Sequence, residues 1–359
     1  MVGPSLSESG RPYLRFEGAG DKVWLLPTQL MLRQTAVKMY APYSLKGRVF
    51  KALMRIGAVG NRVHIDDAEL SDLEQTLAQA LGEPAVRLAF YNPVLPDRRI
   101  LLIMKPEGGI IAYAHMAGSD SARQVLEHEE QILNTLREAP ALAPHVPETI
   151  AFLNHNSASV LIISAGPGQK GPTEWTAHHS DFSRKLHATF KKDLPLGKSA
   201  LWRHSMTVLE NNKPHLSELW RKRYDAALVR LEPYKDTVIP MSMAHRDFTP
   251  WNTQVGREHI FVFDWEYARD GYTPNYDYFF FHFVISSNVN RNVSVEGARS
   301  WLPGAPIKAP VSNEVLFLAY LLDIATFYHR GLEAPDFEET DILRESGTLL
   351  DGIDEWFKN

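Results

Sequence analysis

Cysteine is absent from the 359-residue chain. Without a thiol, the protein can form no disulfide, use no thiolate nucleophile and hold no zinc ion or iron–sulfur cluster through sulfur. Neither sign of charge is in marked excess, since 38 lysines and arginines face 43 aspartates and glutamates. The resulting formal net charge of −5 provides no basic field, so we expect no nucleic-acid partner.

Long hydrophobic runs are also missing. The most apolar stretches, Tyr278–Ser286 and Leu316–Ala325, are far shorter than the roughly 20 residues of a membrane-spanning helix. The first twenty residues are polar and rich in glycine, proline and serine, which is not the pattern of a signal peptide. We therefore expect a cytoplasmic protein without a membrane span.

Two common hydrolase patterns are absent as well. The chain contains neither the His-Glu-x-x-His spacing of a zinc hydrolase nor the Gly-x-Ser-x-Gly turn of a serine hydrolase. Its length is sufficient for two lobes with separate cores.

The hydrophobic pattern changes along the chain. Residues 1–20 are interpreted as a loose leader, and the segment from Trp24 to Gly82 as mainly helical. Branched and aromatic runs after Pro84 predict an antiparallel meander, followed by a helix, a further strand, a breaker-rich hinge and then mostly helices. The expected helices are 30–40, 47–56, 66–81 and 121–137, the strands 86–91, 100–104, 110–115 and 160–163, and the hinge 164–172.

A short basic amphipathic segment, Lys46–Ile56, permits two interpretations. It could rest on an anionic membrane surface or contact a lipid-linked substrate. We favour a helix that docks on the small lobe through Val49, Phe50 and Leu53.

The most informative segment lies between residues 243 and 266. It is typical of an irregular polar loop, a strand, a tight turn and an apolar strand that ends in an acid. This order brings Asp247, Asn252 and Asp264 to positions where a loop and a hairpin end converge. Carboxylate and amide oxygens are the protein ligands that Mg²⁺ prefers, together with phosphate oxygens.

The pattern His-x-Asp-x-x-x-x-Asn, formed by His245, Asp247 and Asn252 and followed by Asp264-Trp265-Glu266, resembles the aminoglycoside phosphotransferase/choline kinase-like family. The resemblance implies an α+β, bilobal, protein-kinase-like fold with a small antiparallel-sheet N-lobe and a mainly helical C-lobe. In this chain an N-terminal helical extension precedes the two lobes. The corresponding domains are 1–83, 84–165 and 166–359.

The same resemblance implies Mg²⁺-dependent transfer of the γ-phosphate of ATP, or of GTP, to a hydroxyl of a small molecule. The acceptor would be a sugar, an amino alcohol or an aminoglycoside-like compound. Asp247 would accept or orient the hydroxyl proton, and Asn252 and Asp264 would hold the metal. His245 would brace the loop, and Glu266 would be either a further acid on the metal side or the cap of a local turn.

Asp277 also has two interpretations at this stage. It would either accept hydrogen bonds from the catalytic-loop backbone, as the resemblance implies, or serve as an ordinary helix N-cap.

The chain departs from the family at the nucleotide. His115 stands where the third strand of the small lobe usually carries a lysine, and Glu129 is its expected helix partner. The alternative is that His115 faces solvent. Ser164 and Gly166, at the hinge, are further predicted nucleotide contacts. Because of His115, a catalytically weak or inactive nucleotide-binding module is the alternative function.

The loop that would cover the nucleotide, residues 92–99, contains no glycine. Arg98 and Arg99 would either supply charge to phosphate or lie exposed on the surface, and we favour exposure.

The acceptor itself is left open by the sequence. The segment with Tyr320, Asp323, Phe327 and Tyr328 is a candidate lining for its site, although core packing explains most of these residues. A hydroxyl on a protein or on a lipid-linked glycan is an alternative target, and the sequence does not predict the oligomeric state.

Overall fold

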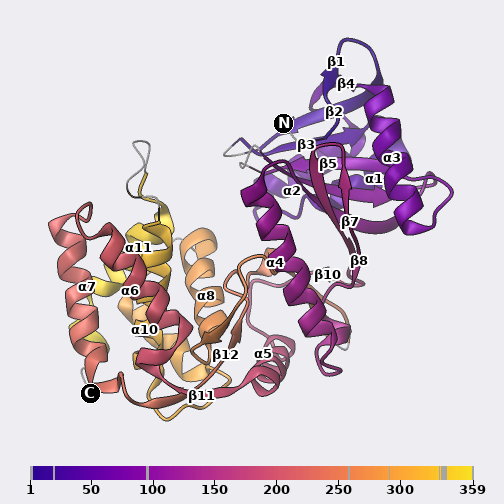
Figure 1. The fold of residues 1–359 in the computed structure, drawn as a ribbon. Coiled ribbons are helices and arrows are strands. Elements are labelled where there is room, and N and C mark those ends of the chain that lie inside the picture. The colour runs from indigo at the N-terminus through magenta and orange to yellow at the C-terminus, as the bar shows by residue number, and fades with distance from the viewer. Residues whose placement is uncertain are drawn as a thin grey trace. The chain divides into compact units, whose positions relative to one another are not determined.

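The computed structural model describes residues 3–18, 21–93, 97–257, 259–290, 292–330, 332 and 338–357. The chain divides into two compact units, unit 1 (residues 1–167) and unit 2 (residues 168–359), which Figure 1 colours from indigo to magenta and from magenta to yellow. Parts of the predicted leader and of the loop after Asn92 (residues 1–2, 19–20 and 94–96) lie outside the described residues.

Unit 1 is built around one antiparallel sheet. Its described strands follow the order β1-β4-β2-β3-β5-β6-β7-β9-β8, so the four strands of the N-terminal segment extend the meander at one edge. The strands are β1 (Leu6–Ser7), β2 (Arg11–Glu17), β3 (Val23–Pro27), β4 (Asn61–Ile65), β5 (Arg87–Asn92), β6 (Arg98–Met104), β7 (Ile110–Ala117), β8 (Thr149–His155) and β9 (Ala158–Ser164).

Helices cover both faces of this sheet. Because side chains alternate along a strand, Ala114 and Met116 of β7 share a core with leucines of α3, whereas His115 faces α4. A second core joins α1 and α2 to strands β3, β5 and β6. The helices of unit 1 are α1 (Leu30–Ala36), α2 (Leu45–Ile56), α3 (Asp67–Leu81) and α4 (Asp120–Arg137).

The predicted helices of the N-terminal segment are confirmed, and local capping explains their limits. The side chain of Asp66 accepts the N–H groups of Ala68 and Glu69 at the start of α3. The helix ends at Gly82, whose φ of +65° is a left-handed conformation that glycine adopts without strain. The predicted strands β5, β6, β7 and β9 and helix α4 are also confirmed.

Two interpretations of the N-terminal segment were wrong. Residues 11–17 are not a loose leader but strand β2, which pairs with β3 and β4. The segment from Trp24 is not helical at its start, because Val23–Pro27 forms β3. The extension is therefore a mixture of strands and helices. The predicted docking of α2 is confirmed for Phe50, which packs on the core beside the buried Met54, but was wrong for Val49, which is 54% exposed.

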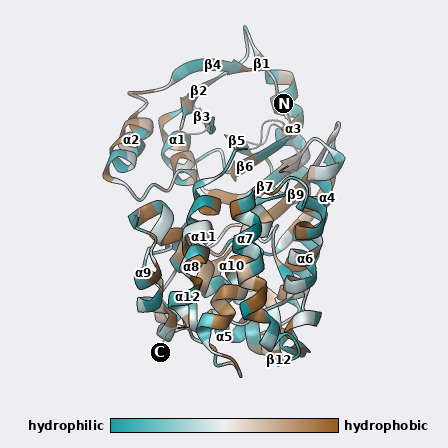
Figure 2. Cartoon of the chain, turned by 90° about the vertical axis from the view of Figure 1, so that its left-hand side faces the viewer, coloured by the Kyte–Doolittle hydropathy of each residue, from teal (hydrophilic) through white to brown (hydrophobic). Residues whose placement is uncertain are grey.

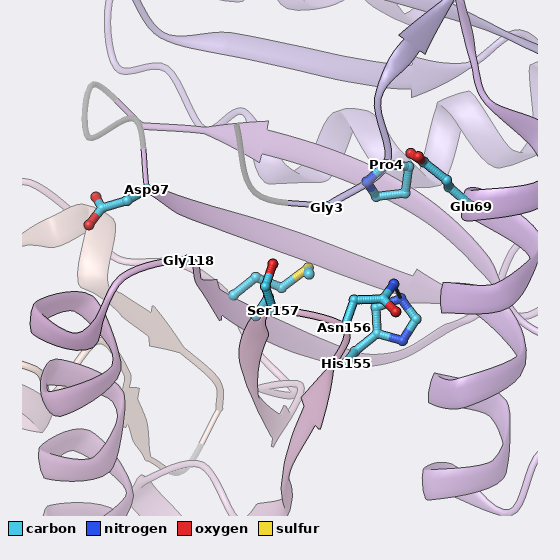
Figure 3. Close-up of a pocket in the computed structure, with 10 residues that line it drawn as sticks. Gly3, Pro4, Glu69, Asp97, Gly118, His155, Asn156 and Ser157 are labelled. Atoms are coloured by element: carbon cyan, nitrogen blue, oxygen red, sulfur yellow. Dashed lines mark hydrogen bonds between the residues drawn. The ribbon is translucent and has the colours of Figure 1, made fainter.

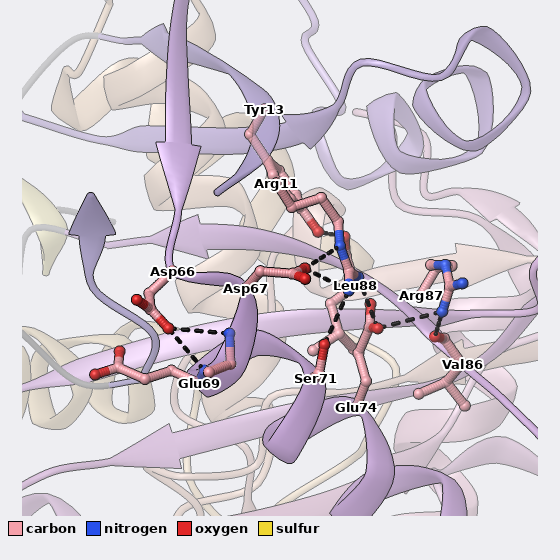
Figure 4. A network of polar contacts seen from close by, with 11 residues as sticks. Arg11, Tyr13, Asp66, Asp67, Glu69, Ser71, Glu74, Val86, Arg87 and Leu88 are labelled. Carbon is pink, nitrogen blue, oxygen red and sulfur yellow. Dashed lines mark hydrogen bonds and ion pairs between the residues drawn. The ribbon is translucent and has the colours of Figure 1, made fainter. Parts of the chain in front are cut away.

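An ion-pair network attaches the extension to the rest of unit 1 (Figure 4). The carboxylate of Glu74 in α3 forms ion pairs with Arg11 of β2 at 2.7 Å and with Arg87 of β5 at 3.2 Å. Arg11 also donates to Asp67 at 3.0 Å. The Glu74 side chain is 7% exposed, and burial raises its pKa while Arg11 opposes the shift. One buried carboxylate thus connects two strands to the helix that covers them.

Unit 2 is mainly helical, with two small three-stranded sheets, β10-β13-β14 and β11-β12-β15, among its described residues. Its helices are α5 (Ala177–Phe190), α6 (Ala200–Asn212), α7 (Glu218–Leu231), α8 (Tyr276–Val284), α9 (Val295–Trp301), α10 (Asn313–Tyr328), α11 (Asp341–Asp351) and α12 (Ile353–Trp356). Its strands are β10 (Gln169–Lys170), β11 (Lys192–Pro195), β12 (Val238–Ala244), β13 (Thr253–Val255), β14 (Ile260–Val262) and β15 (Arg269–Tyr272).

Helix α10 forms the centre of the unit 2 core. It is buried at every position from Val315 to Thr326 and is largely brown, that is hydrophobic, in Figure 2. A helix that is apolar all round must be enclosed by other elements, and α6, α7, α8 and α11 pack against it. None of the helices in the described residues combines the length and the apolar character needed to cross a membrane.

We predict that Glu74→Gln lowers the free energy of unfolding of unit 1 by about 1–3 kcal/mol, because two arginines lose their buried acceptor charge. The matched control is Glu127→Gln, which breaks the exposed Arg123–Glu127 pair and should cost less than about 1 kcal/mol. Thermal unfolding with hydrogen exchange at the β2 and α3 amides measures both variants. Equal costs would contradict an anchoring role for Glu74.

Candidate functional site

The predicted catalytic segment connects strand β12 to the β13–β14 hairpin in unit 2. Thr253 of β13 pairs with Val262 of β14, and the ladder continues one step beyond this pair. There the N–H of Phe263 donates to the carbonyl of Asn252 at 3.1 Å. Hairpin pairing therefore fixes Asn252 beside the residue that precedes Asp264.

His245 joins the loop to this hairpin. Its Nδ1 accepts the N–H of Asp247 at 3.2 Å, so its Nε2 carries the proton and donates to the carbonyl of Phe263 at 3.0 Å. The ring is fully buried and lies 4.5 Å from the ring of Trp265, measured between centroids. One ring nitrogen is therefore engaged by the loop and the other by the hairpin. This geometry is that of a brace and not of a proton shuttle.

Asp247 and Asn252 are in direct contact. Asn252 Nδ2 donates to the Asp247 carboxylate at 2.7 Å and to its backbone carbonyl at 3.0 Å. Burial raises the pKa of Asp247 well above its ordinary value, and the negative charges of Asp264 and Glu266 raise it further. The predicted carboxylates are thus close enough to repel one another, which is the electrostatic condition that a bound cation relieves.

Two residues of this region have unusual backbone conformations. Arg246 has a φ of +68° and Asp264 a φ of +70°, in the left-handed region that residues other than glycine seldom occupy. Each costs about 1 kcal/mol or more and persists only where surrounding contacts hold it. Arg246 directly precedes Asp247, and Asp264 follows the β13–β14 hairpin. The strained backbone therefore lies at or beside the predicted site carboxylates.

Asp277 holds the strained loop from the start of α8. Its two carboxylate oxygens accept the N–H of His245 and the N–H of Arg246, both at 2.9 Å. The brace interpretation is thereby confirmed, and the N-cap interpretation was wrong, because Asn275 occupies the N-cap. Burial raises the pKa of Asp277 to about 6, although both backbone hydrogen bonds oppose the shift.

Sequence reasoning missed the partner of Arg246. Its guanidinium pairs with the fully buried Asp323 of α10 at 3.2 Å, and Asp323 also accepts the hydroxyl of Tyr276 at 2.6 Å. The signal for this pair was present in the sequence, since a single carboxylate inside the apolar run of α10 requires a buried partner. Asp323 and Tyr320 are core residues, as their complete burial establishes.

The predicted pair of unit 1 is formed. His115 Nδ1 lies 2.9 Å from the carboxylate of Glu129, and both side chains are buried. The solvent-facing alternative for His115 was therefore wrong. Ser164 ends β9 and accepts the N–H of Glu148 through its Oγ at 2.9 Å, and Gly166 follows in the segment that leads out of unit 1.

The exposure predicted for Arg99 was wrong. Arg99 is 2% exposed, because it projects from β6 on the same face as Leu101, lies over the ring of Phe90 and is covered by Pro4. Burial lowers the pKa of Arg99 to about 10.

A pocket of about 610 Å³ opens nearby in unit 1 (Figure 3). None of the predicted site residues lines it. Met116 does so, and its neighbour His115 projects from the opposite face of the sheet. The pocket is therefore separate from the His115–Glu129 pair. Its lining consists of Gly3, Pro4, Glu69, Asp97, Met116, Gly118, His155, Asn156, Ser157 and Ala158.

The donor set beside Asp247 suits a hard cation. Among the described residues, no three histidine, aspartate or glutamate side chains gather closely enough to hold a metal by themselves. Both side-chain hydrogen bonds of Asn252 use Nδ2, so its Oδ1 is the atom that would approach a cation. A sparse set of carboxylate and amide oxygens fits Mg²⁺, which usually takes its remaining ligands from water and phosphate.

These elements define a kinase-like fold, with a sheet and one helix carrying a buried pair in unit 1 and a catalytic-type loop and hairpin in unit 2. The family model described as "Phosphotransferase enzyme family" matches residues 115–306, more than half of the chain. The chain therefore belongs to the phosphotransferase enzyme family, which confirms the resemblance drawn from the motif. No curated protein matches the chain by sequence.

Solved structures support the fold. A thermostable mutant of aminoglycoside phosphotransferase APH(4)-Ia, in its apo form, is 15% identical with a TM-score of 0.54, covering 79% of this chain and 98% of that one. Its ternary complex with ADP and hygromycin B is 16% identical, with a TM-score of 0.55 and coverages of 80% and 99%. The GDP complex of wild-type aminoglycoside 2'-phosphotransferase-IIIa is 13% identical, with a TM-score of 0.52 and coverages of 79% and 98%. These likenesses establish the kinase-like fold.

We predict that Asp277 makes the stability of unit 2 dependent on pH. Its pKa rises from 3.8 to about 6 on folding, so the folded state keeps a proton that the unfolded state has released between these values. This raised pKa contributes about 3 kcal/mol to the free energy of unfolding below pH 4, and the contribution is lost as the pH rises through 6. Relative to Asp277→Asn, the wild type should lose stability between pH 4 and pH 7.

Urea unfolding followed by tryptophan fluorescence measures this difference, because all eight tryptophans except Trp24 belong to unit 2. Asp236→Asn, at an exposed position, is the control and should follow the wild-type profile. A constant difference between wild type and Asp277→Asn across this range would refute the assignment.

Proposed function

We propose that the chain transfers the γ-phosphate of ATP, or of GTP, to a hydroxyl group of a small molecule. Membership of the phosphotransferase family supports the reaction class. The main support for the roles of individual residues is the hydrogen bond from Asn252 to Asp247, together with the negative charge of Asp264 that acts on Asp247. In this proposal the extension 1–83 supports the small lobe 84–165, and the lobe 166–359 carries the acceptor chemistry.

Asp247 acts as the base. Its carboxylate takes the proton of the acceptor hydroxyl as the oxygen of that hydroxyl bonds to the γ-phosphorus. The bond from this phosphorus to the bridging oxygen breaks, and the nucleoside diphosphate leaves. The raised pKa of Asp247 suits proton acceptance, since a base must have sufficient affinity for the proton that it takes.

Asn252 and Asp264 would hold Mg²⁺, with Glu266 as a further acid beside it. The ion would supply positive charge against the phosphate oxygens as negative charge moves toward the leaving group. The contribution of the chain is positional: the hairpin fixes Asn252 and Asp264, while Asp277 and His245 hold the loop that presents Asp247.

His115 and Glu129, with Ser164 and Gly166, form the proposed nucleotide-binding set of unit 1. In the family, a lysine usually pairs with the helix glutamate at this position. The His115 side chain keeps a hydrogen-bond donor directed at the buried carboxylate, as that lysine would. The alternative function is a module that binds a nucleotide but does not transfer phosphate. It follows from the same replacement of lysine by histidine, because a neutral imidazole carries no charge. Turnover measurements decide between them.

We predict that Asp247→Asn abolishes phosphate transfer, with a loss of about 10³-fold or more in kcat, while nucleotide binding stays within about twofold. Asp264→Asn should instead weaken Mg²⁺-dependent nucleotide binding by about tenfold or more. Isothermal titration with and without Mg²⁺, combined with an acceptor-panel assay, separates the two effects. Asp236→Asn is the surface control, and retained transfer in Asp247→Asn would exclude Asp247 as the base.

His115→Lys tests the nucleotide assignment. A lysine at this position of β7 can pair with Glu129 and present a full positive charge, so we predict that nucleotide affinity or turnover is retained or improved by up to about tenfold. His115→Ala should lower both, because it removes the imidazole that pairs with the buried Glu129. A sharp loss in His115→Lys, with unchanged thermal stability, would mean that the imidazole itself has a specific role.

A further inference from the structure

Helix α2 of unit 1 is apolar on two opposite sides. One side carries Gly47, Phe50 and Met54 and packs into the core. The core leaves the other side uncovered. At about 100° per residue, positions 45, 49, 52 and 56 fall together on one side of the helix, about half a turn away from the core side. This row, which we call the α2 stripe, consists of the exposed residues Leu45, Val49, Ala52 and Ile56.

The large side chains of the α2 stripe are mostly in water. Leu45 is 78% exposed, Ile56 64% and Val49 54%. Figure 2 shows hydrophobic and hydrophilic residues alternating along α2, so the stripe is bordered by polar positions. Single exposed apolar residues are ordinary on a protein surface. A continuous row along one side of a helix is different, because a single partner can remove all of it from water at once.

Basic side chains border the α2 stripe, and the helix contains no acid to balance them. The same angular spacing puts Arg48 and Arg55 on one flank of the stripe and Lys46 on the other. All three residues are exposed. Among the residues that the structure describes, their side chains form no ion pair or hydrogen bond. The cations beside the stripe are therefore available to an anionic partner.

Two further lysines add to this local positive charge. Lys51 belongs to α2, and Lys38 is exposed in the short helix Val37–Met39 that follows α1. Burial lowers the pKa of Lys51, and the positive charges of Arg55 and Lys38 lower it further. The chain as a whole has a formal net charge of −5. This basic group is therefore a local feature of the surface, and a negatively charged partner would relieve its repulsion.

The combination of an apolar row and flanking cations favours one kind of partner. At a bilayer surface, apolar side chains enter the boundary between headgroups and acyl chains, while lysines and arginines meet anionic headgroups. A nucleic acid would use the cations but leave the apolar row in water. A second copy of the chain would cover the row but bring like charges together. An anionic lipid surface satisfies both features.

We propose that α2 binds the surface of a bilayer that contains anionic lipid, with the α2 stripe entering the headgroup region and the flanking cations contacting the lipid headgroups. The contact is peripheral, because α2 has 12 residues whereas a membrane span needs about 20. The proposal concerns a surface of unit 1 and does not depend on the proposed phosphate transfer.

Flotation of the full-length protein with lipid vesicles tests the proposal. One set of vesicles is pure phosphatidylcholine, and the other contains about one third phosphatidylglycerol, which is anionic. We expect partition into the anionic vesicles to be about tenfold or more stronger at low salt. The preference should weaken at high salt, because salt screens the exposed cations.

One pair of variants tests the α2 stripe. Val49→Glu places a negative charge in the middle of the stripe and should lower partition into anionic vesicles by about tenfold or more. Val229→Glu makes the same change at a 71% exposed position of α7 and should bind as the wild type does. Thermal unfolding checks that each variant folds. Leu45→Gln, at the 78% exposed first residue of α2, is the second stripe variant and should also weaken binding.

A second pair tests the cations at equal net charge. The double variant Arg48→Glu/Arg55→Glu should abolish the preference for anionic vesicles. Its control, Arg221→Glu/Lys222→Glu, reverses two exposed charges of α7 and should retain most of the preference. Equal losses in the two double variants would show that only the overall charge matters and would overturn the proposal.

Three other outcomes would also overturn the proposal. The first is equal partition into both kinds of vesicles, or partition into neither. The second is self-association that Val49→Glu removes, without vesicle binding, which would identify a second copy as the partner. The third is binding to duplex DNA or RNA that is lost in Arg48→Glu/Arg55→Glu but kept in Val49→Glu, without vesicle binding, which would identify a nucleic-acid surface.

Discussion

The two hydrogen bonds from the catalytic-loop backbone to Asp277 are the constraint on which the rest of the site depends. They hold consecutive N–H groups of His245 and Arg246, at the point where Arg246 adopts a left-handed conformation. A single carboxylate satisfies two buried donors and fixes the direction in which the chain continues. The next residue is Asp247, so these two bonds fix the backbone that leads into it.

Electrostatics then gives this loop its chemical character. Asp247 is buried with the charges of Asp264 and Glu266 close by, and its pKa rises in consequence. Such an arrangement destabilises the protein without ligand, because burying like charges together is unfavourable. The surrounding structure compensates through the hairpin, through Asn252 and through the packing of His245 against Trp265. Burial and repulsion of this kind are typical of sites that handle protons and cations.

Buried charged groups are paired in both units of the chain. In unit 1, His115 pairs with the buried Glu129, and the N-terminal segment extends the sheet and is anchored by Glu74. In unit 2, Arg246 is balanced by Asp323 inside α10, and Arg330 lies over the ring of Phe327.

The sequence by itself determined what depends on neighbouring residues. The acidic start and glycine end of α3, the meander β5–β7, and the spacing that places Asp247 in a loop beside the hairpin of Asn252 and Asp264 all follow from local hydrogen bonding and periodicity. Only the tertiary structure decided the pairing of β2 with β4, the burial of Arg99 and the partnership of Arg246 with Asp323, 77 residues away. The physical reason is that distant partners are chosen by the packing of the whole unit, which local residue patterns do not encode.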